Sequence, residues 1–326
     1  MTISLAVLVL ILFFALCSSP SISLEQKSEE VNIQRGDVQL AGTLELPHSQ
    51  GRVPALLMVP GSAAFDRSNY GLFDALADSL TGLGFATLRV DDRGTGRSDG
   101  KKHDLSADDL ADDILALHSY LRGRPEIDPR RVGLLGHSFG GALIPVAASR
   151  SSKIAFVITL AGYALTGENL MMETRRRYEE SRDIDDAQRH RILAFQEAMF
   201  DAAKAGGPWE TVEEELRNLN RIELSRPDDE TVLQLAKSPW FKSFLALDPD
   251  PSIRSLRIPF LAIFGGSDVS VSPELNIEAM RKSLSENPGS VVHVVPEANH
   301  FFKVSGSISE DLFAKITEWL IVGFEK

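Results

Sequence analysis

Two glycines flank a serine at a fixed spacing in the stretch Gly136-His137-Ser138-Phe139-Gly140, directly behind a short apolar run. A tight turn from a strand into a helix crowds the backbone, and glycines at these two positions relieve that crowding. Such a turn lifts the serine hydroxyl above the carboxyl edge of a sheet, beside the positive end of a helix. The pattern therefore predicts a nucleophilic serine at position 138. A serine that only caps a helix is the alternative.

A serine hydroxyl is a poor nucleophile without a base, and a neutral histidine is the usual one. Of the seven histidines, His300 lies in a loop just beyond the apolar run 290–296, within reach of the serine turn. His293 lies in the middle of that run, and His137 adjoins the serine with its side chain expected on the other side of the turn. We therefore predict that His300 is the general base.

A third group must fix the imidazole tautomer and stabilise its protonated form. Asp268 comes just after the apolar run 258–264, behind two glycines that free the turn. No acidic residue follows the preceding strand, 153–162, until Glu168. The order Ser138, Asp268, His300, with each residue after a different strand, is the order of a serine hydrolase triad on an α/β sheet.

Two backbone N–H groups are expected to stabilise the oxyanion of the reaction. One is that of Phe139, the residue after the nucleophile. The other comes from the loop after the apolar run 55–60, where we predict the Ser62 N–H, with Gly61 or Ala63 as alternatives.

The elements that must position these groups alternate along the chain. Apolar runs without strict alternation cover 85–90, 131–136, 153–162, 258–266 and 290–296, and helical patterns follow most of them. This alternation indicates an α/β fold around a mostly parallel sheet. Residues 163–253 are helical and charged with no convincing strand, which predicts an insertion of about ninety residues. The expected organisation is a core of 24–162 and 254–326 with a helical cap of 163–253.

Composition narrows the classes of function. The chain has 326 residues, 43% of them hydrophobic, which suffices for one large core. Its formal net charge is −12 with no basic cluster, which argues against nucleic acid as a partner. The Gly94-x-Gly96 loop continues with Asp99 where a dinucleotide loop needs a small residue, so no nicotinamide cofactor is expected. The acidic run 108–113 is interpreted as the solvated face of a helix, and we expect neither a metal nor a cofactor.

Residues 1–23 contain no charged side chain, and their apolar stretch from Leu5 to Cys17 is too short to span a bilayer. Small residues follow it, which predicts a secretory signal peptide and a secreted or periplasmic protein; an uncleaved membrane anchor is the alternative. Because Cys17 is the only cysteine, the mature chain would have no disulfide. We expect no stable membrane association after cleavage.

The chain resembles the α/β-hydrolase superfamily, and more narrowly the capped, secreted bacterial esterases related to serine aminopeptidase-type hydrolases. The resemblance covers nearly all of the mature chain and rests on segments in the order of that family: 59–67, 91–100, 136–141, 265–271 and 297–302, with 238–249 in the cap. It implies an eight-stranded, mostly parallel sheet with helices on both faces and a helical cap insertion. It also implies the triad and oxyanion donors given above, and a loop-shaping role for Asp66 and Arg67.

The expected reaction is hydrolysis of a small-molecule carboxylic ester through an acyl-enzyme intermediate on Ser138. Trp240, Phe241 and Phe244 of the cap are candidates for an apolar substrate lining. A peptidase or amidase with the same triad is the alternative, and it would need a cap carboxylate, such as Glu168 or Glu173, to hold a free amine. A relic of the fold that binds without catalysis is a third possibility.

Overall fold

The computed structural model describes residues 27–62 and 65–324. The expected signal peptide at residues 1–23 and the alternative oxyanion donor Ala63 lie outside the described residues. No helix in the described ranges is long and apolar enough to cross a membrane.

An eight-stranded sheet forms the centre of the molecule, with the strand order β1-β2-β4-β3-β5-β6-β7-β8. The strands from β4 to β8 in this order run parallel, and β2 is antiparallel to both β1 and β4. This confirms the mostly parallel sheet. The strands are β1 Lys27–Arg35, β2 Val38–Leu46, β3 Val53–Val59, β4 Ala86–Val90, β5 Ile127–His137, β6 Val157–Leu160, β7 Phe260–Gly265 and β8 Ser290–Val295.

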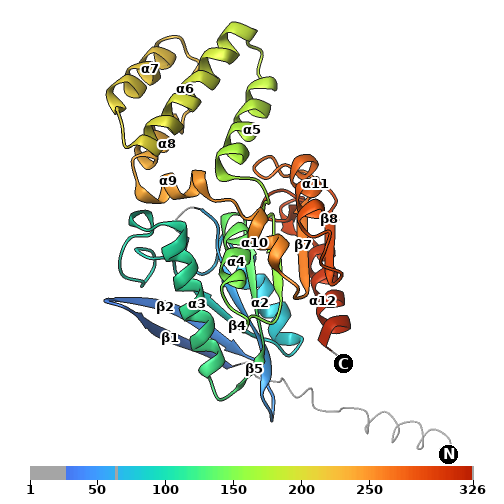
Figure 1. The fold of residues 1–326 in the computed structure, drawn as a ribbon. Coiled ribbons are helices and arrows are strands. Elements are labelled where there is room, and N and C mark those ends of the chain that lie inside the picture. The colour runs from blue at the N-terminus through green and yellow to red at the C-terminus, as the bar shows by residue number, and fades with distance from the viewer. Residues whose placement is uncertain (1–26, 63–64, 325–326) are drawn as a thin grey trace, which may run out of the picture.

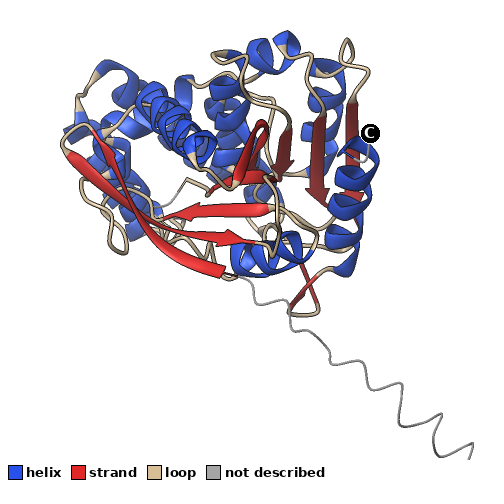
Figure 2. Cartoon of the chain, turned by 90° about the horizontal axis from the view of Figure 1, so that it is seen from below, coloured by secondary structure: helices blue, strands red, loops and turns tan. Residues whose placement is uncertain are grey.

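Helices cover both faces of this sheet, which explains why its central strands are apolar on both sides. Leu57 of β3 lies between Leu88 of β4 and Leu134 of β5, and all three are fully buried. The helices α2 (Leu72–Gly82) and α12 (Glu310–Phe324) contact each other on one face. A connected row covers the other face (Figures 1 and 2): α3 Ala107–Gly123, α4 Phe139–Ser149, α10 Asp250–Ser255 and α11 Pro273–Ser283.

Five of the six helices between β6 and β7 rise from the carboxyl edge of the sheet (Figure 1): α5 Gly167–Glu180, α6 Asp186–Ala205, α7 Trp209–Arg221, α8 Asp229–Ala236 and α9 Pro239–Ala246. They lie within the stretch expected as a cap, and we refer to them as the cap helices. A buried ion cluster joins two of them. Arg175 Nη1 lies 2.6 Å from Asp229 Oδ1, and Arg175 Nε lies 2.8 Å from Glu179 Oε1. Because unpaired buried charges are costly, this cluster fixes how α5 and α8 meet.

Two features differ from the sequence expectations. The acidic run 108–113 is only partly solvated, because Asp113 is buried and its carboxylate binds the guanidinium groups of Arg35 and Arg93. A second, two-stranded sheet, β9 (Lys303–Val304) with β10 (Ser307–Ile308), follows the loop of His300. Strands of two residues are too short to produce a readable alternation of apolar and polar side chains.

Candidate active site

Ser138 occupies the sharp turn between β5 and α4. Its φ of 56° and ψ of −121° lie outside the regions that side-chain-bearing residues prefer, so the surroundings must hold this conformation. The Ser138 N–H donates to the Leu160 carbonyl oxygen of β6 at 2.8 Å. A Cβ atom at Gly140 would lie 2.3 Å from the Pro60 carbonyl oxygen, and one at Gly136 would lie 2.4 Å from the Gly140 carbonyl oxygen. Only glycine fits these two positions.

Asp268 and His300 are joined by a hydrogen bond of 2.7 Å between Oδ2 of the carboxylate and Nδ1 of the imidazole. The Asp268 side chain is fully buried, and its other oxygen accepts from the backbone N–H groups of Ser270 at 2.8 Å and Val271 at 2.9 Å. These bonds fix the carboxylate. Because Nδ1 donates to Asp268, Nε2 of His300 is left with a lone pair to accept a proton.

Ser138 and His300 line one cavity of about 320 Å³. Among the described residues no hydrogen bond joins the Ser138 hydroxyl to the His300 ring. In ligand-free active sites this contact is often long and tightens when substrate binds. The structure therefore brings Asp268 and His300 into direct contact and places Ser138 on the wall of the same cavity.

The cavity lies at the point where the sheet changes direction. The chain passes from β3 to β4 on one side and then returns to place β5 on the other side of β3. Ligands of open α/β sheets bind in the crevice that such a reversal creates outside the carboxyl ends of the strands. The loop after β3 supplies Gly61 and Ser62 to the cavity, and the turn after β5 supplies Ser138.

The two predicted oxyanion donors face an open position. Among the described residues, neither the Ser62 nor the Phe139 N–H has a hydrogen-bond acceptor. A Cβ atom at Gly61 would lie 3.3 Å from Cβ of Ser138, so the loop after β3 packs directly against the serine turn. Unpaired N–H groups beside a serine hydroxyl are the arrangement that stabilises a developing oxyanion.

Of the three residues predicted as an apolar substrate lining, one faces the cavity of Ser138. Phe244 of α9 lines the cavity, but Trp240 and Phe241 do not. Trp240 packs between Phe139 and His103, with ring centroids at 5.5 Å and 5.6 Å respectively. Phe241 packs inside the cap against Phe200 of α6. Trp240 and Phe244 lie one helical turn apart and stack on each other, with ring centroids at 5.2 Å, whereas Phe241 points to another side of the helix.

The cap contributes polar groups that the sequence patterns do not single out. The cavity lining includes Arg175 and Thr174 of α5, Gln196 of α6 and Arg226, and it also includes Tyr163, which follows β6. The lining contains no Asp or Glu among the described residues. Tyr163 is buried, and its hydroxyl has no hydrogen-bond partner in the described ranges. Towards the cap the cavity is lined by the guanidinium groups of Arg175 and Arg226, which are both paired with Asp229.

His137 is a further residue of the site. It is fully buried, and burial, together with the nearby His300, lowers its pKa to about 3. Its Nδ1 lies 3.1 Å from Asn69 Nδ2, and its Nε2 lies 2.8 Å from the His300 carbonyl oxygen. The sequence analysis expects the His137 side chain on the other side of the turn from the nucleophile. It does not predict the contact with the His300 carbonyl oxygen.

The chain is similar to a family model, to a characterised protein and to solved structures. A family model described as alpha/beta hydrolase fold matches residues 54–307. "Esterase EstD" of Thermotoga maritima is 26% identical, with 92% of this chain and 68% of that protein covered. The solved structure of Est1E from Butyrivibrio proteoclasticus with ferulic acid bound has a TM-score of 0.60 at 19% identity, covering 91% of this chain and 100% of that one. The Pyrococcus furiosus esterase Pf2001 has a TM-score of 0.62 at 17% identity, with 91% of each chain covered.

Proposed function

The chain belongs to the α/β hydrolase fold family, and we propose that within it the chain is a carboxylic ester hydrolase with Ser138 as nucleophile. The observation that carries this proposal is the hydrogen bond of 2.7 Å between Asp268 and His300, with His300 on the wall of the cavity that Ser138 also lines. The similarity to EstD of Thermotoga maritima supports an ester as the substrate.

In the proposed acylation step, Oγ of Ser138 attacks the carbonyl carbon of the ester while Nε2 of His300 takes its proton. The carbonyl oxygen becomes an oxyanion and accepts hydrogen bonds from the Ser62 and Phe139 N–H groups. When the tetrahedral intermediate collapses, His300 returns the proton to the leaving alcohol. The acyl group then remains as an ester on Ser138.

In deacylation, His300 removes a proton from a water molecule, which attacks the acyl carbon. The second tetrahedral intermediate uses the same two N–H groups. Its collapse releases the carboxylic acid, and the proton on His300 returns to Ser138. Asp268 stabilises the imidazolium in both steps without becoming protonated.

The lack of a carboxylate in the described lining of the cavity favours an ester over an amine-bearing peptide. A free amino terminus needs a carboxylate partner in the cavity. Glu168 instead binds Lys204 at 2.9 Å, and Glu173 binds Arg177 at 2.9 Å, and neither carboxylate lines the cavity of Ser138. The guanidinium groups of Arg175 and Arg226 lie there instead, both paired with Asp229, so the described lining offers no free carboxylate to an amine.

The test is turnover of p-nitrophenyl esters of graded acyl length beside aminoacyl anilides. We expect ester hydrolysis, and its loss in Ser138→Ala. Ser149→Ala is the matched control, because this serine lies on the same α4 helix and, among the residues that the structure describes, its hydroxyl contacts only the Val146 carbonyl and Ser252. Activity that survives in Ser138→Ala would refute the proposal. Preference for the anilides would favour the amidase alternative, and no turnover of either class would favour a binding relic.

The location of the enzyme is a separate proposal, which rests on the composition of residues 1–23. We expect a secreted or periplasmic protein whose mature chain lacks this segment. Amino-terminal sequencing of protein recovered outside the cytosol tests it. Recovery of an uncleaved chain in the membrane fraction would favour the anchor instead.

A further inference from the structure

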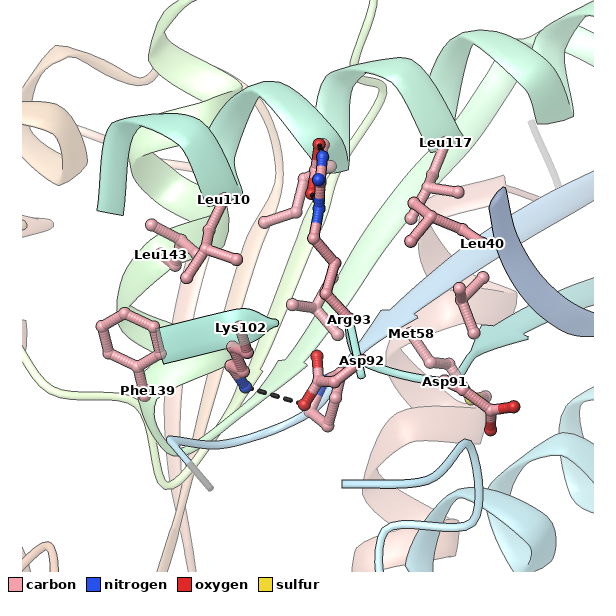
Figure 3. Close-up of a pocket in the computed structure, with 15 residues that line it drawn as sticks. Leu40, Met58, Asp91, Asp92, Arg93, Lys102, Leu110, Leu117, Phe139 and Leu143 are labelled. Atoms are coloured by element: carbon pink, nitrogen blue, oxygen red, sulfur yellow. Dashed lines mark hydrogen bonds and ion pairs between the residues drawn. The ribbon is translucent and has the colours of Figure 1, made fainter. Parts of the chain in front are cut away.

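Lys102 is an ammonium group held inside the molecule next to the loop that follows β3. Its side chain is 3% exposed, and it lies in the 3₁₀ helix η1 (Lys102–Asp104). Its Nζ lies 2.7 Å from Asp92 Oδ2 and 2.6 Å from the Gly61 carbonyl oxygen. Figure 3 shows the contact with Asp92 in a pocket beneath α3. The volume of this pocket is about 60 Å³. Burying a charge carries a large desolvation cost, so its position requires an explanation.

The contact with Gly61 has a consequence on the opposite side of the peptide. The peptide between Gly61 and Ser62 is trans, so its C=O and N–H point in opposite directions. The carbonyl oxygen points towards Lys102, which lines the pocket beneath α3. The Ser62 N–H therefore points the other way, towards the cavity that Gly61 and Ser62 share with Ser138.

Asp92 holds the same loop at its other end. Its Oδ2 accepts both from Lys102 Nζ and from the backbone N–H of Phe65, the latter at 3.0 Å. Gly61 on one side and Phe65 on the other are thus tied to one buried ion pair. Asp92, in the loop that follows β4, therefore holds the loop that follows β3 in place.

We propose that Lys102 is a positioning residue for the oxyanion site, which orients the Gly61–Ser62 peptide and polarises it. A cation bound to the carbonyl oxygen draws electron density away from the amide nitrogen and makes the Ser62 N–H a stronger donor. In a site shielded from water, this effect is larger than in solution. The inference rests on the proposed ester hydrolysis, because it concerns the negative charge that develops only in that reaction.

The test compares Lys102→Met with wild-type enzyme in three measurements: kcat, KM and the inhibition constant of n-butylboronic acid. The boronate adduct of the serine is tetrahedral and anionic, so it reports on the oxyanion site. We expect kcat to fall about 10–100-fold and the boronate constant to rise by a similar factor, with KM within about threefold, since removal of a whole donor costs about 10²–10³ in kcat. Lys102→Arg, which retains the charge, should restore most of the activity.

Arg93→Met is the matched control, because Arg93 follows Asp92 in the loop after β4 and forms a comparable ion pair with Asp113, at 2.7 Å, but points to α3 (Figure 3). We expect a lower melting temperature with kcat and the boronate constant unchanged. Burial raises the pKa of Asp92, and Lys102→Met removes its cationic partner while the bond from the Phe65 N–H remains. The double variant Asp92→Asn/Lys102→Met removes the carboxyl group as well and serves if the single variant is poorly folded.

Two outcomes separate this inference from the proposed function. In the first outcome the wild type hydrolyses esters, and Lys102→Met or the double variant is less stable but unchanged in kcat and in boronate inhibition. This result would overturn the role of Lys102 and leave ester hydrolysis intact. A wild type without ester hydrolysis would overturn both. Lys102→Gln, which keeps a neutral donor for the Gly61 carbonyl, should show a smaller fall in kcat than Lys102→Met.

Discussion

The imidazole of His137 donates a hydrogen bond from Nε2 to the backbone carbonyl oxygen of His300, at 2.8 Å. The direction of this bond follows from the other ring nitrogen, since the Asn69 amide nitrogen, at 3.1 Å, is a donor and makes Nδ1 the acceptor. Burial lowers the pKa of His137 to about 3, so the ring stays neutral and keeps this tautomer at ordinary pH. The bond ties the serine turn to the loop that carries the proposed base.

Replacing His137 should therefore disturb the position of the base. For His137→Phe we expect kcat to fall about tenfold with little change in KM, because a small displacement of a catalytic group is costly in rate. His137→Gln keeps an amide donor near the same position and should lose less. Steady-state kinetics on one p-nitrophenyl ester checks both. An unchanged kcat in His137→Phe would show that the His300 loop holds its position without this bond.

The contact between Asp268 and His300 gives a second prediction. Asp268→Asn removes the charge that stabilises the imidazolium and favours the wrong tautomer, so kcat should fall about 10²–10⁴-fold with KM nearly unchanged. Asp311→Asn is the control, because Asp311 contacts the His293 ring in the same way, at 3.1 Å, but on the surface. Single-turnover kinetics should show the loss in acylation itself. Equal losses in the two variants would contradict the assignment of His300 as base.

The residues of the proposed triad are predictable from the sequence because each has a local signal. Ser138, Asp268 and His300 each follow an apolar strand directly, and glycines mark the first two turns. The parallel sheet then brings the carboxyl ends of these strands to one edge. The sheet topology therefore brings together residues that lie far apart in the chain.

The contacts of Lys102 and Phe244 are not predictable from local sequence patterns. Lys102 reaches a carbonyl 41 positions earlier in the chain, and no local pattern reports a contact of that kind. The only signal is that Asp92 follows a strand at the same sheet edge. Likewise, helical spacing identifies the apolar residues of α9, but which of them faces the cavity depends on how the cap packs on the core.

The close approach at Gly140 predicts a large effect from a single methyl group. In Gly140→Ala the new Cβ would meet the backbone carbonyl of Pro60 at 2.3 Å, so the loop after β3 must move away. We expect the free energy of unfolding to fall by about 1–3 kcal/mol and ester hydrolysis to be lost. Gly123→Ala, in the last turn of α3 with no atom near its Cβ position, should instead stabilise by about 0.5–1 kcal/mol. Denaturant unfolding and activity assays measure both.

Tyr163 carries a buried hydroxyl without a partner among the described residues. Burial raises the pKa of this hydroxyl, so it remains neutral. Because an unsatisfied buried polar group is destabilising, Tyr163→Phe should raise the free energy of unfolding by about 1 kcal/mol. Tyr120→Phe, whose hydroxyl accepts from Arg124 Nη1 at 3.3 Å, should not be stabilised. A loss of stability in Tyr163→Phe would mean that water or a ligand forms a hydrogen bond with the hydroxyl. If the variant also has a higher KM for esters with a polar acyl group, that ligand is the substrate.

His118 makes the stability of the core depend on pH. Its ring is buried, its Nε2 lies 3.3 Å from the Val132 carbonyl oxygen, and burial lowers its pKa to about 4. In the unfolded chain a histidine titrates near its ordinary value of about 6.5, so below that pH the unfolded state binds the extra proton. Stability from this group is therefore complete above about pH 6.5 and falls as the pH decreases towards 4. Between pH 7.5 and 4.5 the free energy of unfolding of the wild type should fall by roughly 2 kcal/mol more than that of His118→Gln, which does not titrate. Urea unfolding at both pH values measures this difference, and parallel curves for the two proteins would show that His118 is not the group responsible.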